Sequence, residues 1–231
     1  MRRENTADVL KEKKLILVLD LDNTLLHSVE DGSLSSEDEY LIQLREFVED
    51  DRDRSVFRWS GMVTKLRPRV RAFLKQASAM YDMYVYTMGS REYASQMTEF
   101  LDPEGVYFKN KVLSREDCTA PNQKGLDVVL GEERAVVIID DSRTVWRRHT
   151  RNQIEIKAYH FFGPKRPILD FDGNPLSDTE ELESKHSALD NALGYLKRIH
   201  WLFFRGARYH DNSDGDVRRV LLRIADEMQQ E

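Results

Sequence analysis

The sequence is almost without cysteine, and it has no long hydrophobic run. Cys118 is the single cysteine among 231 residues, which excludes an internal disulfide, a disulfide-rich scaffold and a thiolate zinc finger. The longest aliphatic runs, over 15–19 and 135–139, are far shorter than the roughly 18 to 20 residues that cross a bilayer, and residues 1–8 are polar and charged. We therefore expect no membrane span and no signal peptide.

An excess of positive charge is missing as well. The chain has 35 lysines and arginines against 41 aspartates and glutamates, for a net charge of −6. That balance argues against binding driven by counterion release, so we expect no direct nucleic-acid partner. Residues 30–54 hold ten acids and only three bases. We interpret residues 28–62 as an acidic insertion, in which weak alternation over 40–44 suggests a β-hairpin.

Alternating strand-like and helix-like segments predict the fold class. Short aliphatic runs indicate buried strands, and apolar positions at 3.6 spacing indicate helices. Strands are predicted over 15–19, 63–66, 83–86, 112–113, 135–139 and 154–159, and helices from Pro68, over 91–101 after an N-cap at Ser90, over 179–204 and over 217–228. This order is typical of βαβ units. We predict an α/β fold with a Rossmann-like, mainly parallel sheet, helices on both faces, small insertions and C-terminal helices.

Length and composition predict the domain organisation. At about 150 residues per domain, the chain is expected to form one full domain with appendages. We assign residues 1–14 to an N-terminal extension, 15–165 to the main domain and 166–231 to a linker with C-terminal helices. The proline-containing segment 164–175 is interpreted as a connection.

Four acids follow two of the predicted strands. Asp20 and Asp22 come after the first strand, and Asp140 and Asp141 after the strand over 135–139. Ligands of open parallel sheets bind beyond the carboxyl ends of the strands, where like charges about 4 Å apart repel by roughly 4 kcal/mol. Such a cluster needs a cation, and an all-oxygen ligand set favours Mg²⁺ bound together with substrate phosphate. Either pair alone could merely end a strand or cap a helix.

The combination of these acids with Thr24, Thr87 and Lys124 is more specific. Residues 20–24, Asp-Leu-Asp-Asn-Thr, match the Asp-x-Asp-x-Thr/Val signature and resemble the haloacid dehalogenase superfamily of phosphotransferases. More narrowly, the runs over 65–68, 86–90, 113–115 and 139–146 resemble the phosphatases that dephosphorylate the C-terminal heptad repeats of RNA polymerase II. The resemblance covers about residues 15–204 and implies the superfamily's fold and chemistry.

The resemblance implies a role for each catalytic residue. Asp20 would attack phosphorus and form an aspartyl-phosphate, while Asp22 would protonate the leaving seryl oxygen and then accept a proton from water. Dehalogenases and aspartyl-phosphate ATPases of the superfamily lack an acid at the position of Asp22, which favours a phosphatase. Thr87 would donate its hydroxyl to a phosphoryl oxygen, and Lys124 would neutralise charge on the phosphate and orient Asp20.

A metal shell is implied in the same way. Asp20 through its carboxylate, Asp22 through its backbone carbonyl and Asp141 would bind Mg²⁺, with Asp140 in or beside that shell.

Substrate contacts are expected from Arg115, Thr24, Ser90 and Arg67. Arg115 matches an arginine that is substrate-facing in the family, although it could be a surface arginine. Arg67 could instead pair with a nearby acid.

The residues and the resemblance together predict a Mg²⁺-dependent protein serine phosphatase. Its substrate would be the phosphorylated heptad repeats in the largest chain of RNA polymerase II, and its location nuclear. Two alternatives stay open: a phosphatase of a small phosphorylated metabolite, for which the segments between the motifs leave little room for a large cap, and an inactive phosphopeptide-binding scaffold. The acidic block and the C-terminal helices could dock transcription factors.

Overall fold

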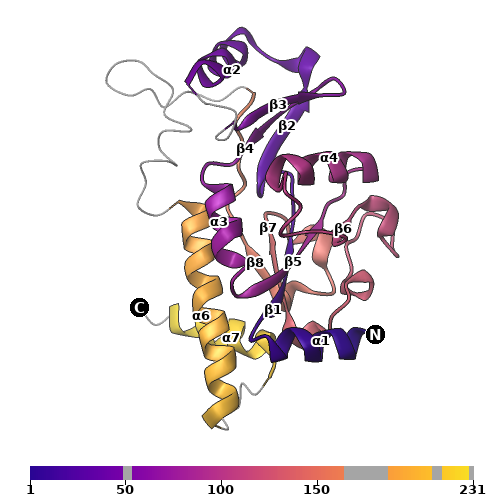
Figure 1. The fold of residues 1–231 in the computed structure, drawn as a ribbon, viewed down its shortest axis with the longest axis vertical. Coiled ribbons are helices and arrows are strands. Elements are labelled where there is room, and N and C mark those ends of the chain that lie inside the picture. Colours follow the sequence, from indigo (N-terminus) through magenta and orange to yellow (C-terminus); the bar gives the residue numbers. More distant parts are fainter. Residues whose placement is uncertain (49–53, 164–186, 210–214, 229–231) are drawn as a thin grey trace.

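A five-stranded parallel sheet lies at the centre of the molecule (Figure 1). The computed structural model describes residues 1–48, 54–163, 187–209 and 215–228. Across the sheet, the strands are β6 (Val112–Leu113), β5 (Tyr81–Tyr86), β1 (Leu15–Leu19), β7 (Val136–Asp140) and β8 (Gln153–Glu155). β1 is the middle strand and all its residues are fully buried, which explains its unbroken aliphatic sequence. The predicted α/β fold with a mainly parallel sheet is confirmed.

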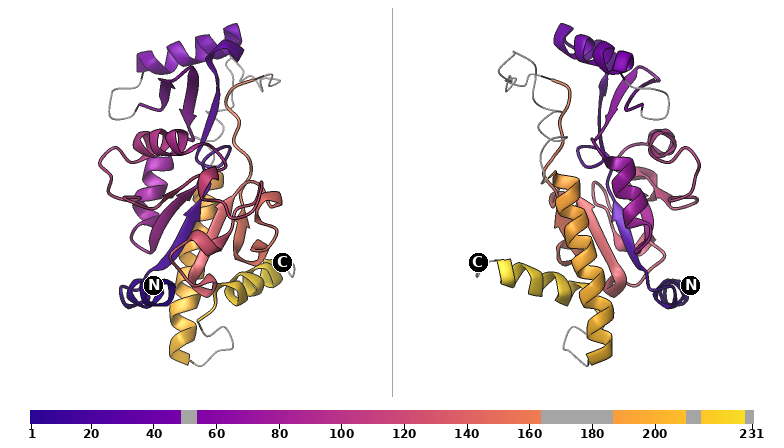
Figure 2. Two further views of the ribbon diagram at one scale, coloured as in Figure 1. Left: turned by 90° about the vertical axis from the view of Figure 1, so that its right-hand side faces the viewer. Right: turned by 60° about the vertical axis from the view of Figure 1, so that its left-hand side comes forward.

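Helices cover both faces of this sheet (Figures 1 and 2). Alternate side chains of β1, at 15, 17 and 19, join a hydrophobic cluster with α3 (Val70–Ala77), α6 (Ala188–Tyr209) and α7 (Val217–Met228). The intervening side chains, Ile16 and Val18, pack in a second cluster with Val9 of α1 (Arg2–Lys11) and with Trp146. The C-terminal helices therefore share their apolar core with the sheet.

A small antiparallel sheet lies beyond the carboxyl end of β1 (Figure 1). Its strands, in spatial order, are β2 (Leu26–Glu30), β4 (Met62–Leu66) and β3 (Val56–Trp59). The predicted hairpin over 40–44 is wrong, because this stretch lies in the helix α2 (Ser36–Val48). Ser35 and Asp38 form reciprocal backbone-to-side-chain bonds of 3.0 Å at its start, a capping box that outweighs the weak alternation.

The other predicted elements agree with the structure in part. α4 (Arg91–Leu101) and α7 have the predicted bounds, and the Ser90 side chain caps α4 as expected. β8 ends at Glu155, short of the predicted 159, and the extension over 1–14 contains the unpredicted helix α1. The predicted helical residues 179–186 and the connection over 164–175 lie outside the described residues. Among the helices that are described, none has the length and apolar character needed to cross a bilayer.

Removing a buried leucine of α6 tests whether this helix belongs to the core. Leu196 is fully buried, whereas Leu222 of α7 is 64% exposed. We expect Leu196→Ala to lower the free energy of unfolding by about 2–5 kcal/mol, and Leu222→Ala to change it by less than about 0.5 kcal/mol. Urea denaturation followed by far-UV circular dichroism measures both. An early separate transition for Leu196→Ala, with the main transition unchanged, would contradict the shared core.

Candidate active site

The chain turns sharply at the carboxyl end of β1. Asp20 is still fixed to the sheet, because its N–H donates to the Ile139 carbonyl at 3.0 Å. Asn23 then adopts a left-handed conformation with φ of 60°, which asparagine tolerates better than most residues. Its N–H and carbonyl bind Leu26 and Tyr159, respectively. The turn therefore holds Asp20 and Asp22 at the edge of the sheet where parallel strands end.

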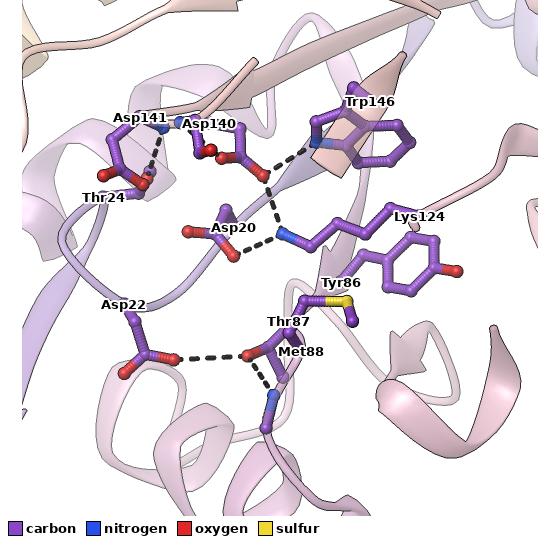
Figure 3. A network of polar contacts seen from close by, with 12 residues as sticks. Asp20, Asp22, Thr24, Tyr86, Thr87, Met88, Lys124, Asp140, Asp141 and Trp146 are labelled. Carbon is purple, nitrogen blue, oxygen red and sulfur yellow. Dashed lines mark hydrogen bonds and ion pairs between the residues drawn. The ribbon is translucent and has the colours of Figure 1, made fainter. Parts of the chain in front are cut away.

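A buried lysine joins two of the predicted carboxylates (Figure 3). Lys124 Nζ lies 2.5 Å from Asp20 Oδ1 and 2.7 Å from Asp140 Oδ2, so it pairs with the ends of β1 and β7 together. Burial opposes the charge of Lys124, but the two carboxylates outweigh it and raise the lysine pKa. The ammonium therefore stays charged and draws the neighbouring strand ends together.

Three carboxylates form a group that could hold a metal ion. Ligand atoms of Asp20, Asp140 and Asp141 all lie within 4.8 Å of one another. Burial is the main cause that raises the pKa of Asp20 to about 7, with Asp140 and Asp22 adding to it and Lys124 opposing. The pKa of Asp141 is also raised, by burial and then by Asp140. One lysine does not balance three carboxylates, so the oxygen-only set fits a hard divalent cation.

Asp140 and Asp141 differ in what they already bind. Asp140 Oδ2 accepts from Trp146 Nε1 at 2.7 Å as well as from Lys124, and Asp140 Oδ1 accepts from the Ser142 N–H at 2.8 Å. Asp141 is half-buried. The arrangement suits Asp140 to orient Lys124, and it suits Asp141 to offer its carboxylate to a cation.

Asp22 lies apart from this carboxylate group. Its Oδ1 accepts from the Tyr93 hydroxyl at 2.5 Å, and its Oδ2 from Thr87 Oγ1 at 3.3 Å. Burial raises the pKa of Asp22, while the Tyr93 and Thr87 hydrogen bonds lower it. Thr87 itself follows the end of β5, where its Oγ1 also accepts from the Gly89 N–H. The two acids of one motif thus have separate surroundings, one beside a lysine and one beside hydroxyl groups.

Two residues expected to contact substrate are held inside the protein instead. Thr24 is fully buried, and its Oγ1 accepts from the Asp141 N–H at 3.2 Å. Arg67 is 2% exposed, and its Nη1 donates to the carbonyls of Thr24 and Lys157 at 3.1 and 3.0 Å. These contacts hold the motif turn and the Asp141 backbone in place, and substrate binding by the two residues stays a prediction.

Ser90 and Arg115 lie on the Thr87 side of the site. Ser90 Oγ accepts from the Tyr93 N–H at 3.2 Å and begins α4. Arg115 is exposed, and its N–H donates to the Gly89 carbonyl at 3.0 Å. Substrate binding by these two residues stays a prediction.

Sequence reasoning missed two partners of the site acids. The role of Trp146 as a hydrogen-bond donor to Asp140 was not foreseen, and neither was that of Tyr93 as a donor to Asp22. A usable signal for Tyr93 is its position three residues after the predicted N-cap Ser90, which places it on the first helical turn beyond a strand end. Trp146 lies in a 3-10 turn, which periodicity does not detect.

Comparison with known proteins agrees with this geometry. The family model described as "NLI interacting factor-like phosphatase" matches residues 15–191. The chain belongs to this family. One relative is RNA polymerase II C-terminal domain phosphatase-like 4 of Arabidopsis thaliana, 41% identical over 99% of this chain and 53% of its own length. Another is a Homo sapiens protein named as a C-terminal domain phosphatase of RNA polymerase II, 33% identical over 69% of this chain and 16% of its own length.

A solved structure of a named RNA polymerase II CTD phosphatase has a similar fold. Fission yeast RNA polymerase II CTD phosphatase Fcp1-R271A bound to beryllium fluoride aligns with a TM-score of 0.70 and 25% identity, over 95% of this chain and 73% of that one. This likeness confirms the predicted superfamily fold. This chain spans about half of the length of the Arabidopsis thaliana relative and less of the Homo sapiens one.

Replacing the buried hydroxyl of Thr24 tests whether it holds the Asp141 backbone in place. Thr24→Val keeps the shape but leaves the Asp141 N–H without its acceptor, so we expect a loss of about 1–3 kcal/mol in the free energy of unfolding. Thr24→Ser retains the hydroxyl and should lose less. Chemical denaturation at pH 7 compares the three proteins, and a Thr24→Val variant as stable as the parent would refute the assignment.

Proposed function

We propose that this chain is a Mg²⁺-dependent protein serine phosphatase that acts on phosphorylated heptad repeats in the largest chain of RNA polymerase II. The observation that carries the proposal is the separation of the two motif acids. Asp20 lies in a group of carboxylates and pairs with Lys124. Asp22 lies outside this group and accepts hydrogen bonds from two hydroxyls. One acid is suited to attack phosphorus, and the other to exchange a proton.

The first chemical step transfers the phosphoryl group to Asp20. An Asp20 oxygen forms a bond to phosphorus as the bond from phosphorus to the seryl oxygen breaks, and the proton of Asp22 passes to that oxygen. The raised pKa of Asp22 favours the protonated form that this step needs. Lys124 and the Thr87 hydroxyl would bind oxygens of the transferring group, where charge accumulates.

The second step releases phosphate. Asp22, now ionised, takes a proton from water as the water oxygen attacks phosphorus, and the bond to Asp20 breaks. Asp20 and Asp141 carboxylates, with the Asp22 carbonyl, would hold Mg²⁺, and Asp140 would act through Lys124. When bound there, Mg²⁺ supplies positive charge to the phosphoryl oxygens and favours ionised Asp20.

The substrate class is proposed from the relatives and from the size of the inserted segments. The names of both relatives above refer to phosphatases of the RNA polymerase II C-terminal domain. Between Asp22 and Lys65 the described chain has β2, α2, β3 and most of β4, and between Thr87 and Lys124 it has α4, β6 and short turns. These elements are small for a cap that encloses a metabolite. A protein substrate also accords with a nuclear location, and docking of transcription factors stays a prediction.

Activity on phosphoserine heptad peptides tests the proposal. With Mg²⁺ present, we expect release of phosphate from YSPTSPS peptides, and a fall of at least about 10³-fold in kcat for Asp20→Asn, because the nucleophile is lost. The kcat of Lys124→Met should fall by a similar factor, because the substitution removes the cation beside Asp20 and the phosphate. Phosphate release is measured for peptides phosphorylated at single serines. The matched control is Asp226→Asn, which changes an exposed carboxylate on α7.

Three results would contradict the proposal. Activity that survives Asp20→Asn or EDTA would remove the mechanism. Far higher turnover of a small phosphorylated metabolite than of any phosphopeptide would replace the substrate class, and tight peptide binding without phosphate release would favour a scaffold.

Metal binding should depend on pH in a direction set by Asp20. In the metal-free fold, the pKa of Asp20 is about 7, above the ordinary 3.8. Between these two pH values the folded chain keeps the Asp20 proton and the unfolded chain loses it, so the free energy of unfolding of the metal-free protein falls as pH rises. Mg²⁺ must displace that proton at pH 5.5 but not at pH 8. We expect a fixed millimolar concentration of Mg²⁺ to raise Tm more at pH 8 than at pH 5.5. An equal shift, or one retained by Asp141→Asn, would contradict the ligand set.

A further inference from the structure

A chain of hydroxyl groups runs from Asp22 into the small sheet. Tyr93 Oη lies 2.5 Å from Asp22 Oδ1 and 2.8 Å from Ser28 Oγ. Ser28 Oγ lies 2.8 Å from Thr64 Oγ1. Ser28 and Thr64 are directly opposite each other on β2 and β4, so the register of the small sheet fixes the far end of the chain.

The proton count gives this chain a direction. A phenol carries one proton, and Tyr93 donates it to Asp22 Oδ1. Ser28 can then donate to Tyr93 Oη. Thr64 can donate to Ser28 Oγ at 2.8 Å or to Met97 Sδ at 3.4 Å, and the shorter contact to the stronger acceptor favours Ser28. Thr64 is 1% exposed, so solvent does not compete at the far end. Each hydroxyl in the series has a partner, which is what holds a polar chain rigid inside a protein.

We propose that Tyr93, Ser28 and Thr64 form a relay that positions the Asp22 carboxyl for proton transfer to the leaving group. The relay rests on the proposed function, in which Asp22 is the general acid. Because Tyr93 occupies Oδ1, the transferable proton would be carried on Oδ2, and the Thr87 hydroxyl, 3.3 Å from Oδ2, would then donate to a phosphoryl oxygen. The small sheet thereby acts on the reaction through Tyr93, and these three are positioning residues.

A positioning role predicts a dependence on the leaving group that a structural role does not. A seryl oxygen is a poor leaving group that needs a proton in the transition state, whereas p-nitrophenolate leaves without one. The ratio kcat/KM covers only the steps up to the first P–O cleavage. It therefore isolates the acid role of Asp22 from its later action on water.

The test compares a phosphoserine heptad peptide with p-nitrophenyl phosphate. We expect Tyr93→Phe to lower kcat/KM by about 10- to 100-fold on the peptide and by less than about threefold on p-nitrophenyl phosphate, in the direction shown by Asp22→Asn. Thr64→Val should also lose more kcat/KM on the peptide than on p-nitrophenyl phosphate, by a smaller factor. Thr64→Ser keeps the hydroxyl, so its ratio of kcat/KM values for the two substrates should equal that of the parent protein. Thermal unfolding checks that each variant is folded.

A matched control comes from another buried phenol. Tyr81 Oη donates to the Leu196 carbonyl at 2.8 Å, away from Asp22, so Tyr81→Phe should affect the two substrates equally. Equal losses on both substrates for Tyr93→Phe, or no loss on the peptide, would overturn the relay while leaving the proposed function intact. If Tyr93→Phe does not fold, Ser28→Ala takes its place: a larger loss of kcat/KM on the peptide than on p-nitrophenyl phosphate supports the relay, and equal losses overturn it. A parent chain that hydrolyses neither substrate would overturn the proposed function, and the relay with it.

Discussion

The buried contact of Lys124 with Asp20 and Asp140 is the constraint on which the site depends. Adjacent parallel strands bring two carboxylates to one edge of the sheet, where their mutual repulsion would otherwise be uncompensated. Lys124 is held there by its own backbone, whose N–H donates to the Val145 carbonyl at 2.9 Å. Burial makes each of these charges costly alone, so removing Lys124 leaves two buried carboxylates without their cation. The cluster therefore links the ends of β1 and β7 and is also the proposed site of phosphoryl transfer.

Environment, more than residue type, separates the acids of the motif. Asp20 and Asp22 are two positions apart, yet one contacts an ammonium and the other contacts two hydroxyls. The left-handed conformation of Asn23 reverses the chain directly after Asp22. Thr24 and Arg67 then fix that reversal from inside. A compact turn thus gives two identical side chains different chemical capabilities.

The parts of the fold that could be predicted are those with a simple pattern. The aliphatic run of β1, the N-cap Ser90 and the apolar stripe of α6 each report burial or capping directly, and the strand-end acids follow from the carboxyl edge of a parallel sheet. The helix α2 was missed, because its start is marked by the Ser35 and Asp38 capping bonds and not by hydrophobic alternation. Donors such as Trp146 and Tyr93 could not be assigned, because a hydrogen bond between distant segments depends on tertiary placement.

The central position of β1 has a consequence for how the chain folds. This strand is completed on one side by β5, on the other by β7, and is covered by α6, which begins at residue 188. The five aliphatic side chains of β1 are therefore buried only by contacts with segments that are distant in the sequence. Such contacts cost loop-closure entropy before they contribute stability, so β1 is expected to fold more slowly than a strand that pairs with its neighbours in the sequence.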